Sequence, residues 1–397
     1  MRQSAERKVI AMGLFKKAGS LLFIVILFLT IFAVPVCAQE SEAIDNQQIM
    51  EEQLEISGAD ELYDQIPDSA NEILEKNGID GINPDSLIGL SVGDFFQTLW
   101  DMVKSEIHLP LRIFITMLAV VMLCSLFRAF QATIAEKSYT NAFTVVSVLT
   151  VCAVMMSPVV DCITRASEAI RECSNFIVSF IPVFSGIVAA SGKPITAAGY
   201  TSALFGTIQI IAQIAANFLV PLLGMYLAFC MAGSINDSIN ISGITATVRN
   251  VVIWTLGFLL TIFVGLLTLK GLVAGSADTV ATKTTKFLLG SFVPVVGGAL
   301  SEAYNSVQGC MGVIRSTVGS LGIIVCFLTF VPILLTILLL MGALHLSAGI
   351  SELMSVEKVG SILKAGVSAL SLIFGIILMF ALLLIISVTI LLMISTG

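Results

Sequence analysis

Residues 366–394 read GVSALSLIFGIILMFALLLIISVTILLMI, without one charged side chain. About 20 apolar residues in a helix cross the hydrocarbon core of a bilayer, so this run is long enough to span a membrane. Similar runs recur along the 397-residue chain, which is 57% hydrophobic and 12% charged. A soluble domain is about 25% charged and needs more polar surface than this chain offers. The composition predicts an all-α polytopic membrane protein and argues against a soluble enzyme.

The apolar runs predict about eight transmembrane helices. They lie near residues 109–130, 141–160, 176–190, 200–233, 250–269, 287–300, 317–343 and 366–394. The run 200–233 is long for one crossing, and a hairpin bent near Pro221 would raise the total to ten. We expect a single crossing there, hence eight spans. Both schemes place the C-terminus outside the cytoplasm.

The first 38 residues have the plan of a secretory signal peptide. A basic start is followed by the uncharged apolar run 21–36 and by Val36-Cys37-Ala38 at its end. We expect cleavage after Ala38. A retained signal anchor is the alternative, because the run of about 16 residues nearly reaches span length.

Residues 39–107 form an acidic segment that we expect to be helical and extracytoplasmic. Seventeen acidic and two basic side chains fall within residues 39–110. A short helix is predicted at Ser69–Asn77, ended by Gly78. Apolar residues recur at helical spacing from Ser91 to Ile107, which predicts an amphipathic helix. That helix either lies on the membrane interface or packs on the rest of its own domain.

The membrane domain, residues 108–397, contains a predicted internal duplication. Ser179-Phe180-Ile181-Pro182-Val183 is matched by Ser291-Phe292-Val293-Pro294-Val295. Pro221 and Pro332 then follow at nearly equal spacing. We predict two copies of one unit, residues 174–272 and 286–383, against the alternative of chance apolar similarity. In the eight-span scheme the second copy is inverted.

Interrupted apolar segments at matching places in two repeats point to a transport site, or to kinked packing helices. A proline frees a backbone carbonyl that lipid cannot satisfy, so such backbone must face protein or water. The candidate conduit or hinge residues of this kind are Pro182, Gly186, Pro294, Gly297 and Gly298.

A polar stripe is predicted on the helix of the long run 200–233. Gln209, Gln213 and Asn217 follow one another at intervals of four residues and therefore share one helix face. They either line an aqueous path or hydrogen-bond a neighbouring helix.

The charged residues of the membrane domain are expected in connections and at span ends. The polar stretch 161–172, whose charges have helical pair spacing, is expected outside, between two spans. Arg128, Lys137, Lys193 and the loop 270–286 are expected inside, as the positive-inside rule favours. The acidic residues from Asp237 onward fall between predicted spans, so proton-coupled transport by this chain alone has little support.

Motifs for catalysis or cofactor binding are not found in the sequence. The two histidines are far apart, and neither a His-Glu-x-x-His zinc motif nor a phosphate-binding P-loop occurs. We predict a non-enzymatic protein with no cofactor and no metal site. Basic patches rich in aromatic residues are also missing, so the lipid bilayer is an expected partner and nucleic acid is not.

The order of features along the chain resembles the stage III sporulation protein AE family of endospore-forming bacteria. The resemblance rests on order and spacing over the whole chain. It is carried by Gln65-Ile66-Pro67, Ala70, Leu74, Asn77-Gly78-Ile79, Leu87, Leu90, Phe95, Leu99, Leu109-Pro110-Leu111-Arg112 and the two blocks at 179–183 and 291–295.

The resemblance implies a role in sporulation. Such a protein would lie in the mother-cell membrane around the engulfed forespore. It would belong to a channel or secretion-like complex with other stage III A proteins and, indirectly, the forespore stage II sporulation protein Q. That complex maintains the forespore and supports its late sigma-factor activity. A stand-alone small-solute transporter or exporter and a structural scaffold without conduction remain the alternatives.

Overall fold

The computed structural model describes residues 62–76, 92–133, 137–235, 242–292 and 297–396, together with Gly58. All regular elements in these ranges are helices, and six stretches are long and apolar enough to span a membrane. They are Gln97–Phe130, Val145–Ala190, Pro194–Gly233, Gly243–Lys270, Gln308–Leu353 and Glu357–Ile390. The predicted all-α polytopic class is confirmed. The predicted signal peptide, residues 1–38, lies outside the described residues.

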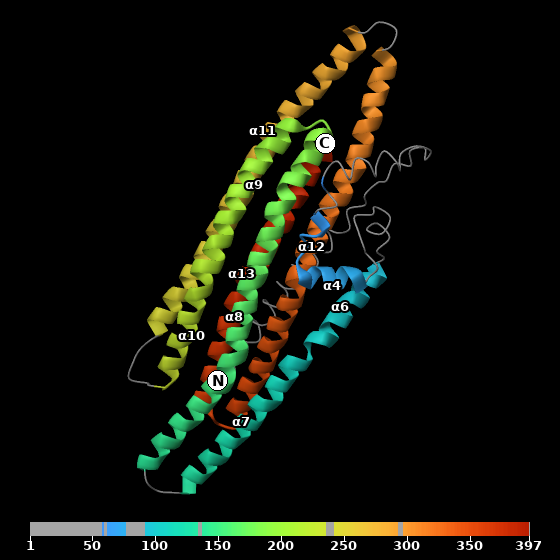
Figure 1. Ribbon diagram of the computed structural model, residues 1–397. Helices are drawn as coiled ribbons and strands as arrows, with labels where there is room; N and C mark the ends of the chain where they lie inside the picture. The colour runs from blue at the N-terminus through green and yellow to red at the C-terminus, as the bar shows by residue number, and fades with distance from the viewer. Residues whose placement is uncertain are drawn as a thin grey trace, which may run out of the picture. The chain divides into compact units, whose positions relative to one another are not determined.

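Figure 1 shows the helices in their order along the chain. They are α4 (Asp68–Lys76), α6 (Val92–Glu106), α7 (His108–Thr133), α8 (Lys137–Ala190), α9 (Pro194–Ile214), the π-helix η1 (Ala215–Leu219), α10 (Val220–Ile235), α11 (Ser242–Phe292), α12 (Gly297–Leu353) and α13 (Glu357–Thr396).

The predicted spans 141–160 and 176–190 lie on one continuous helix, α8. Its 54 residues extend about 80 Å at 1.5 Å per residue, more than twice the thickness of a hydrocarbon core. The polar stretch 161–172 was expected to connect two spans, and that prediction is wrong. Neither glycine nor proline occurs between Pro158 and Pro182, so nothing in the sequence stops the helix there.

The predicted span 287–300 is described only in part. It covers the end of α11 and the beginning of α12, on both sides of a short undescribed segment. The described residues therefore contain six candidate spans where the apolar runs predicted eight.

The long run 200–233 forms one continuous helical stretch, as the expected single crossing requires, and the described residues show no hairpin bend at Pro221. α9, η1 and α10 continue directly into one another within the single candidate span Pro194–Gly233. Pro221 is the second residue after η1, and its ring would clash with the carbonyl of residue 217 in a regular α-helix. The wider π-turn of η1 accommodates this clash without breaking the helix.

Neighbouring helices run antiparallel, as side-chain contacts show. On α8 and α12, Cys173 Sγ lies 3.6 Å from Cys326 Sγ, while Ser191, just beyond α8, accepts a hydrogen bond from Arg315. On α9 and α11, Tyr200 Oη donates to the carbonyl of Leu267, while Asp278, further along α11, accepts from the N–H of Ile195 at the start of α9.

Ser185 Oγ of α8 donates to the carbonyl of Ala197 near the start of α9, while Arg171, earlier on α8, donates to Asn217 of η1, beyond the end of α9. Since α8 is thus antiparallel both to α9 and to α12, the latter two helices run in the same direction.

The two predicted repeats therefore share one orientation, and the expected inversion is wrong. The corresponding proline-bearing elements are α9–η1–α10 and α12, and they are separated by α11 alone. α11 begins in the first predicted copy, 174–272, and ends in the second, 286–383. An inverted pair would need one more crossing between them.

Lys137 and Lys193 were both expected on the cytoplasmic side of the membrane, and the continuous helix α8 does not allow this. Lys137 begins α8 and Lys193 follows its end, so a single crossing puts them on opposite sides of the membrane. The start of α11 then lies on the side of Lys137, opposite the acidic segment.

This topology predicts that Gly243→Cys, at the start of α11, resists a membrane-impermeant thiol reagent in intact cells. The reagent should label it after permeabilisation, because six spans place it in the cytoplasm. Gly243 is exposed and open to a side chain. The variant is made without the native cysteines. The matched control is Ile195→Cys, at the start of α9 and on the opposite side of the membrane in this topology, which the reagent should label in intact cells. Labelling of Gly243→Cys in intact cells would restore the eight-span scheme.

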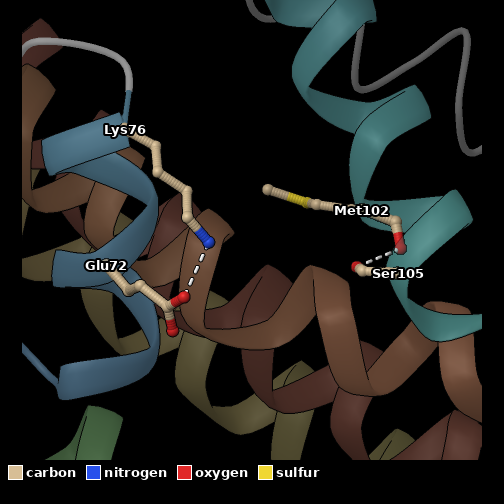
Figure 2. A network of polar contacts seen from close by, with 4 residues as sticks. All are labelled: Glu72, Lys76, Met102 and Ser105. Carbon is tan, nitrogen blue, oxygen red and sulfur yellow. Dashed lines mark hydrogen bonds and ion pairs between the residues drawn. The ribbon is translucent and has the colours of Figure 1, made fainter.

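Helices α4 and α6 pack against the long helix α12. The helix expected at Ser69–Asn77 is observed as α4, and the expected amphipathic helix as α6. Lys76 Nζ pairs with Glu72 Oε1 at 2.6 Å on α4, and Ser105 Oγ donates to the carbonyl of Met102 on α6 (Figure 2). Glu106 Oε2 accepts a 2.6 Å hydrogen bond from Thr336 of α12. Of the two alternatives for α6, the structure supports packing on protein.

Candidate functional site

The polar stripe of α9 and η1 meets α8. Gln209, Gln213 and Asn217 are all exposed, as their shared face predicts. Asn217 Nδ2 donates to Gln213 Oε1, and Arg171 Nη2 of α8 donates to Asn217 Oδ1 over 3.1 Å. The stripe thus forms an interhelical hydrogen bond, one of its two predicted uses.

The π-turn η1 explains why this stripe can reach Arg171. Asn217 is the central residue of η1, whose extra residue per turn rotates the following part of the helix. Arg171 was not among the predicted site residues. Its only sequence signal was its place in a charged stretch with helical spacing, and its partner lies 46 residues away.

Pro182 and Gly186 lie one turn apart on the exposed face of α8. The helix continues through Pro182, so the expected interruption is absent at this position. No heavy atom lies within 4 Å of the place where a Cβ of Gly186 would stand. Nearby, Thr201 of α9 donates to Ser185 Oγ, which ties the end of α8 to the start of α9.

The second set of predicted break residues is only partly described. Pro294 lies outside the described residues. Gly297 and Gly298 are the first two residues of α12. The first proline block lies inside α8, whereas Ser291 and Phe292 of the second block are the last two residues of α11.

A buried polar cluster at the α8–α9 turn was not predicted as a site. Asp278 of α11, 1% exposed, accepts hydrogen bonds from the backbone N–H groups of Ile195 (3.0 Å) and Thr196 (2.6 Å). These N–H groups belong to the first turn of α9, which has no intrahelical acceptor for them. The carboxylate also suits the positive end of the helix dipole. Asp278 was expected in a connection, and the structure places it inside a helix.

Two basic side chains complete this cluster. Arg315 of α12, 7% exposed, donates through Nη1 to Ser191 Oγ over 3.2 Å. Burial and the neighbouring Arg315 guanidinium lower the pKa of Lys193, while Asp278 opposes the change. Among the described residues, Arg315 Nε has no hydrogen-bond partner. Asp278 is therefore a carboxylate that favours the charged form of Lys193 at this turn.

Acidic residues also occur inside a candidate span, contrary to the prediction for the membrane domain. Asp161, Glu168 and Glu172 lie within Val145–Ala190 and are exposed. In the described ranges, no group of three His, Cys, Asp or Glu side chains is placed to hold a metal ion.

The helices and their apolar stretches define an all-α polytopic membrane protein. The family description "Stage III sporulation protein AE" matches residues 85–395, which is most of the chain. The chain therefore belongs to the stage III sporulation protein AE family, and the resemblance seen in the sequence is confirmed. The stage III sporulation protein AE of Bacillus subtilis (strain 168) is 24% identical over 311 residues, covering 74% of this chain and 76% of that relative. No solved structure matches the chain.

Proposed function

We propose that this chain is a non-enzymatic membrane component of a channel or secretion-like complex between mother cell and forespore. It lies in the mother-cell membrane around the engulfed forespore, with other stage III A proteins and, indirectly, the forespore stage II sporulation protein Q. The complex maintains the forespore and supports its late sigma-factor activity. Family membership over residues 85–395 is the observation that carries this proposal.

The long apolar helices support a membrane role for the chain within such a complex. Polar side chains within a candidate span need protein or water beside them. In this proposal the conduit side of the chain is the face that carries Gln209, Gln213 and Asn217 on α9–η1. Pro182 and Gly186 continue that side on α8, and Pro294, Gly297 and Gly298 are their counterparts in the second predicted repeat.

Affinity isolation of the full chain from sporulating cells tests the proposed assembly. The other stage III A proteins should be recovered with the tagged chain after engulfment. A matched sample from growing cells, in which those partners are not made, is the control. Recovery of the chain without them from sporulating cells would contradict the proposal.

Replacing both Pro182 and Pro294 by leucine is expected to abolish sporulation while the protein still accumulates. Leucine restores a backbone donor and favours a regular helix while keeping the segment apolar. The measurement is the spore count beside the abundance of the protein in membranes. Pro332→Leu, at a proline inside α12 that is not among the candidate conduit residues, is the control. Normal sporulation of the double variant would show that Pro182 and Pro294 do not belong to the proposed conduit side.

The two other functions give different results in liposomes. A stand-alone transporter moves small solutes when the purified chain is reconstituted alone. A channel subunit that needs its partners, or a scaffold, gives no flux under the same conditions. Adding the co-isolated partners then separates the last two, because only the channel subunit gains flux.

A further inference from the structure

The polar cluster at the α8–α9 turn holds more positive than negative charge. Its charged members are Lys193 after α8, Asp278 on α11 and Arg315 on α12. Asp278 and Arg315 are buried, and Lys193 is half-buried. Two cations and one carboxylate leave these three residues with a formal charge of +1. A buried charge is unfavourable unless an opposite charge lies beside it, so an excess of this kind favours an anion.

The guanidinium of Arg315 has hydrogen-bonding capacity that the fold does not use. A guanidinium carries five N–H donors, and this one belongs to a side chain that is only 7% exposed. In the described part of the chain it makes one hydrogen bond, from Nη1 to Ser191 Oγ, and no ion pair. Its Nε is buried without an acceptor. A buried donor of a charged group that lacks an acceptor is strongly unfavourable.

The neighbouring oxygen atoms do not neutralise Arg315. Both carboxylate oxygens of Asp278 accept backbone N–H groups from the first turn of α9. Among the described residues, no ion pair joins Asp278 to Arg315. Ser191 Oγ is uncharged, and its own hydrogen is donated to the carbonyl of Val188. The described chain therefore gives Arg315 no anionic partner.

Two further side chains at this turn suit an oxygen-rich anion. Burial lowers the pKa of Lys193, and the nearby guanidinium of Arg315 lowers it further, so the two cations lie close enough to repel each other. Thr196, 0% exposed, has an Oγ1 without a hydrogen-bond partner in the described ranges. An anion at the turn would relieve the repulsion and give both Arg315 and Thr196 an acceptor.

We propose that Arg315, Lys193 and Thr196 bind a phosphate group at the α8–α9 turn. The planar guanidinium donates parallel hydrogen bonds to two oxygens of a phosphate. The remaining phosphate oxygens can accept from the hydroxyl of Thr196 and the ammonium of Lys193, whereas a carboxylate has two oxygens in all. A phosphodiester carries one negative charge and therefore balances the excess charge of the cluster.

Two sources supply phosphate groups to a membrane protein, a phospholipid headgroup and free phosphate. The turn, residues 191–193, joins the candidate spans Val145–Ala190 and Pro194–Gly233. Basic pockets between transmembrane helices are typical sites for lipid headgroups. This inference goes beyond the proposed function and does not depend on it, because binding is measured on the purified chain without sporulation.

The test follows the melting temperature of the purified, delipidated full chain in detergent. One arm adds inorganic phosphate, with chloride at equal ionic strength as its control. The other arm adds short-chain phosphatidylglycerol, with the diacylglycerol of the same chains as its control. In at least one arm a saturating probe should raise the melting temperature by about 5 °C, because a ligand that binds only the folded chain stabilises it.

Arg315→Gln removes the positive charge and keeps an amide that can donate to Ser191. Each variant is compared with its own melting temperature without probe, so a change in basal stability does not affect the result. Half of the full shift should need about tenfold more probe in Arg315→Gln and about threefold more in Lys193→Gln, because charge-assisted bonds are lost. Arg249→Gln, at an exposed arginine of α11, is the matched control and should respond as wild type.

The outcomes separate the two sources and decide the proposal. A response to phosphatidylglycerol alone identifies a lipid headgroup, and a response to inorganic phosphate identifies free phosphate. No shift in either arm overturns the proposal. A shift that needs the same probe concentration in Arg315→Gln and Lys193→Gln as in wild type also overturns it, because the phosphate group then binds elsewhere. If Arg315→Gln does not accumulate, the half-buried Lys193→Gln decides by the same criterion.

Discussion

Replacing Asp278 by alanine is expected to lower the free energy of unfolding by about 3 kcal/mol, since two buried N–H groups lose their acceptor. The change also removes the carboxylate that favours the charged form of Lys193. The start of α9 should then separate from α11, because Asp278 joins these two helices. The measurements are the melting temperature of the purified full chain in detergent and its abundance in membranes. Both should fall clearly.

Glu352→Ala is the matched control for Asp278→Ala. Glu352 also pairs across a helix connection, with Lys364, but both side chains are about half exposed. Exposed ion pairs contribute less than about 1 kcal/mol, so the melting temperature should hardly change. Equal effects of the two substitutions would show that the carboxylate of Asp278 does not hold α9 in place.

Replacing Gly322 by leucine is expected to prevent accumulation of the folded protein. A Cβ at Gly322 would stand 2.6 Å from the ring of Phe180, which is itself 2% exposed. The ring cannot move aside easily, because it stacks on Phe184 at a centroid distance of 5.1 Å. Overpacking of a tight contact costs about 1–3 kcal/mol for small additions, and a leucine adds four carbons. The contact joins α8 to α12, so its loss should separate two long helices.

Gly342→Leu is the control on the same helix. No heavy atom lies within 4 Å of its Cβ position, and Gly342 is exposed. Leucine also favours the helical conformation over glycine by about 1 kcal/mol. The abundance in membranes should therefore stay at the wild-type level. Normal abundance of Gly322→Leu would mean that α8 and α12 do not approach as closely as described.

Local sequence patterns predicted most of the helices, because a span needs a long apolar run and little else. The runs 109–130, 250–269, 317–343 and 366–394 all lie within single helices, α7, α11, α12 and α13. The failure at α8 has a physical cause. Charges at 161–172 suggested a connection, but helix continuity depends on backbone preference, and no glycine or proline interrupts that stretch.

Contacts between distant residues could not be predicted in the same way. The stripe Gln209, Gln213 and Asn217 follows from helical period, yet its partner Arg171 lies on another helix. Asp278 and Thr196 are 82 residues apart, and no local signal links a carboxylate to a distant helix start. The side-by-side order of the helices decides these pairs, and apolar runs alone do not encode it.

The most direct measurement of the central claim follows forespores in a sporulating host that lacks only this chain. A fluorescent reporter of late forespore sigma-factor activity and the forespore volume are recorded cell by cell after engulfment. A membrane component of the complex between mother cell and forespore should leave engulfment complete, the reporter off and the forespore shrinking, and a wild-type copy made only in the mother cell should restore both. Forespores that keep their volume and switch on the reporter without the chain would contradict the account.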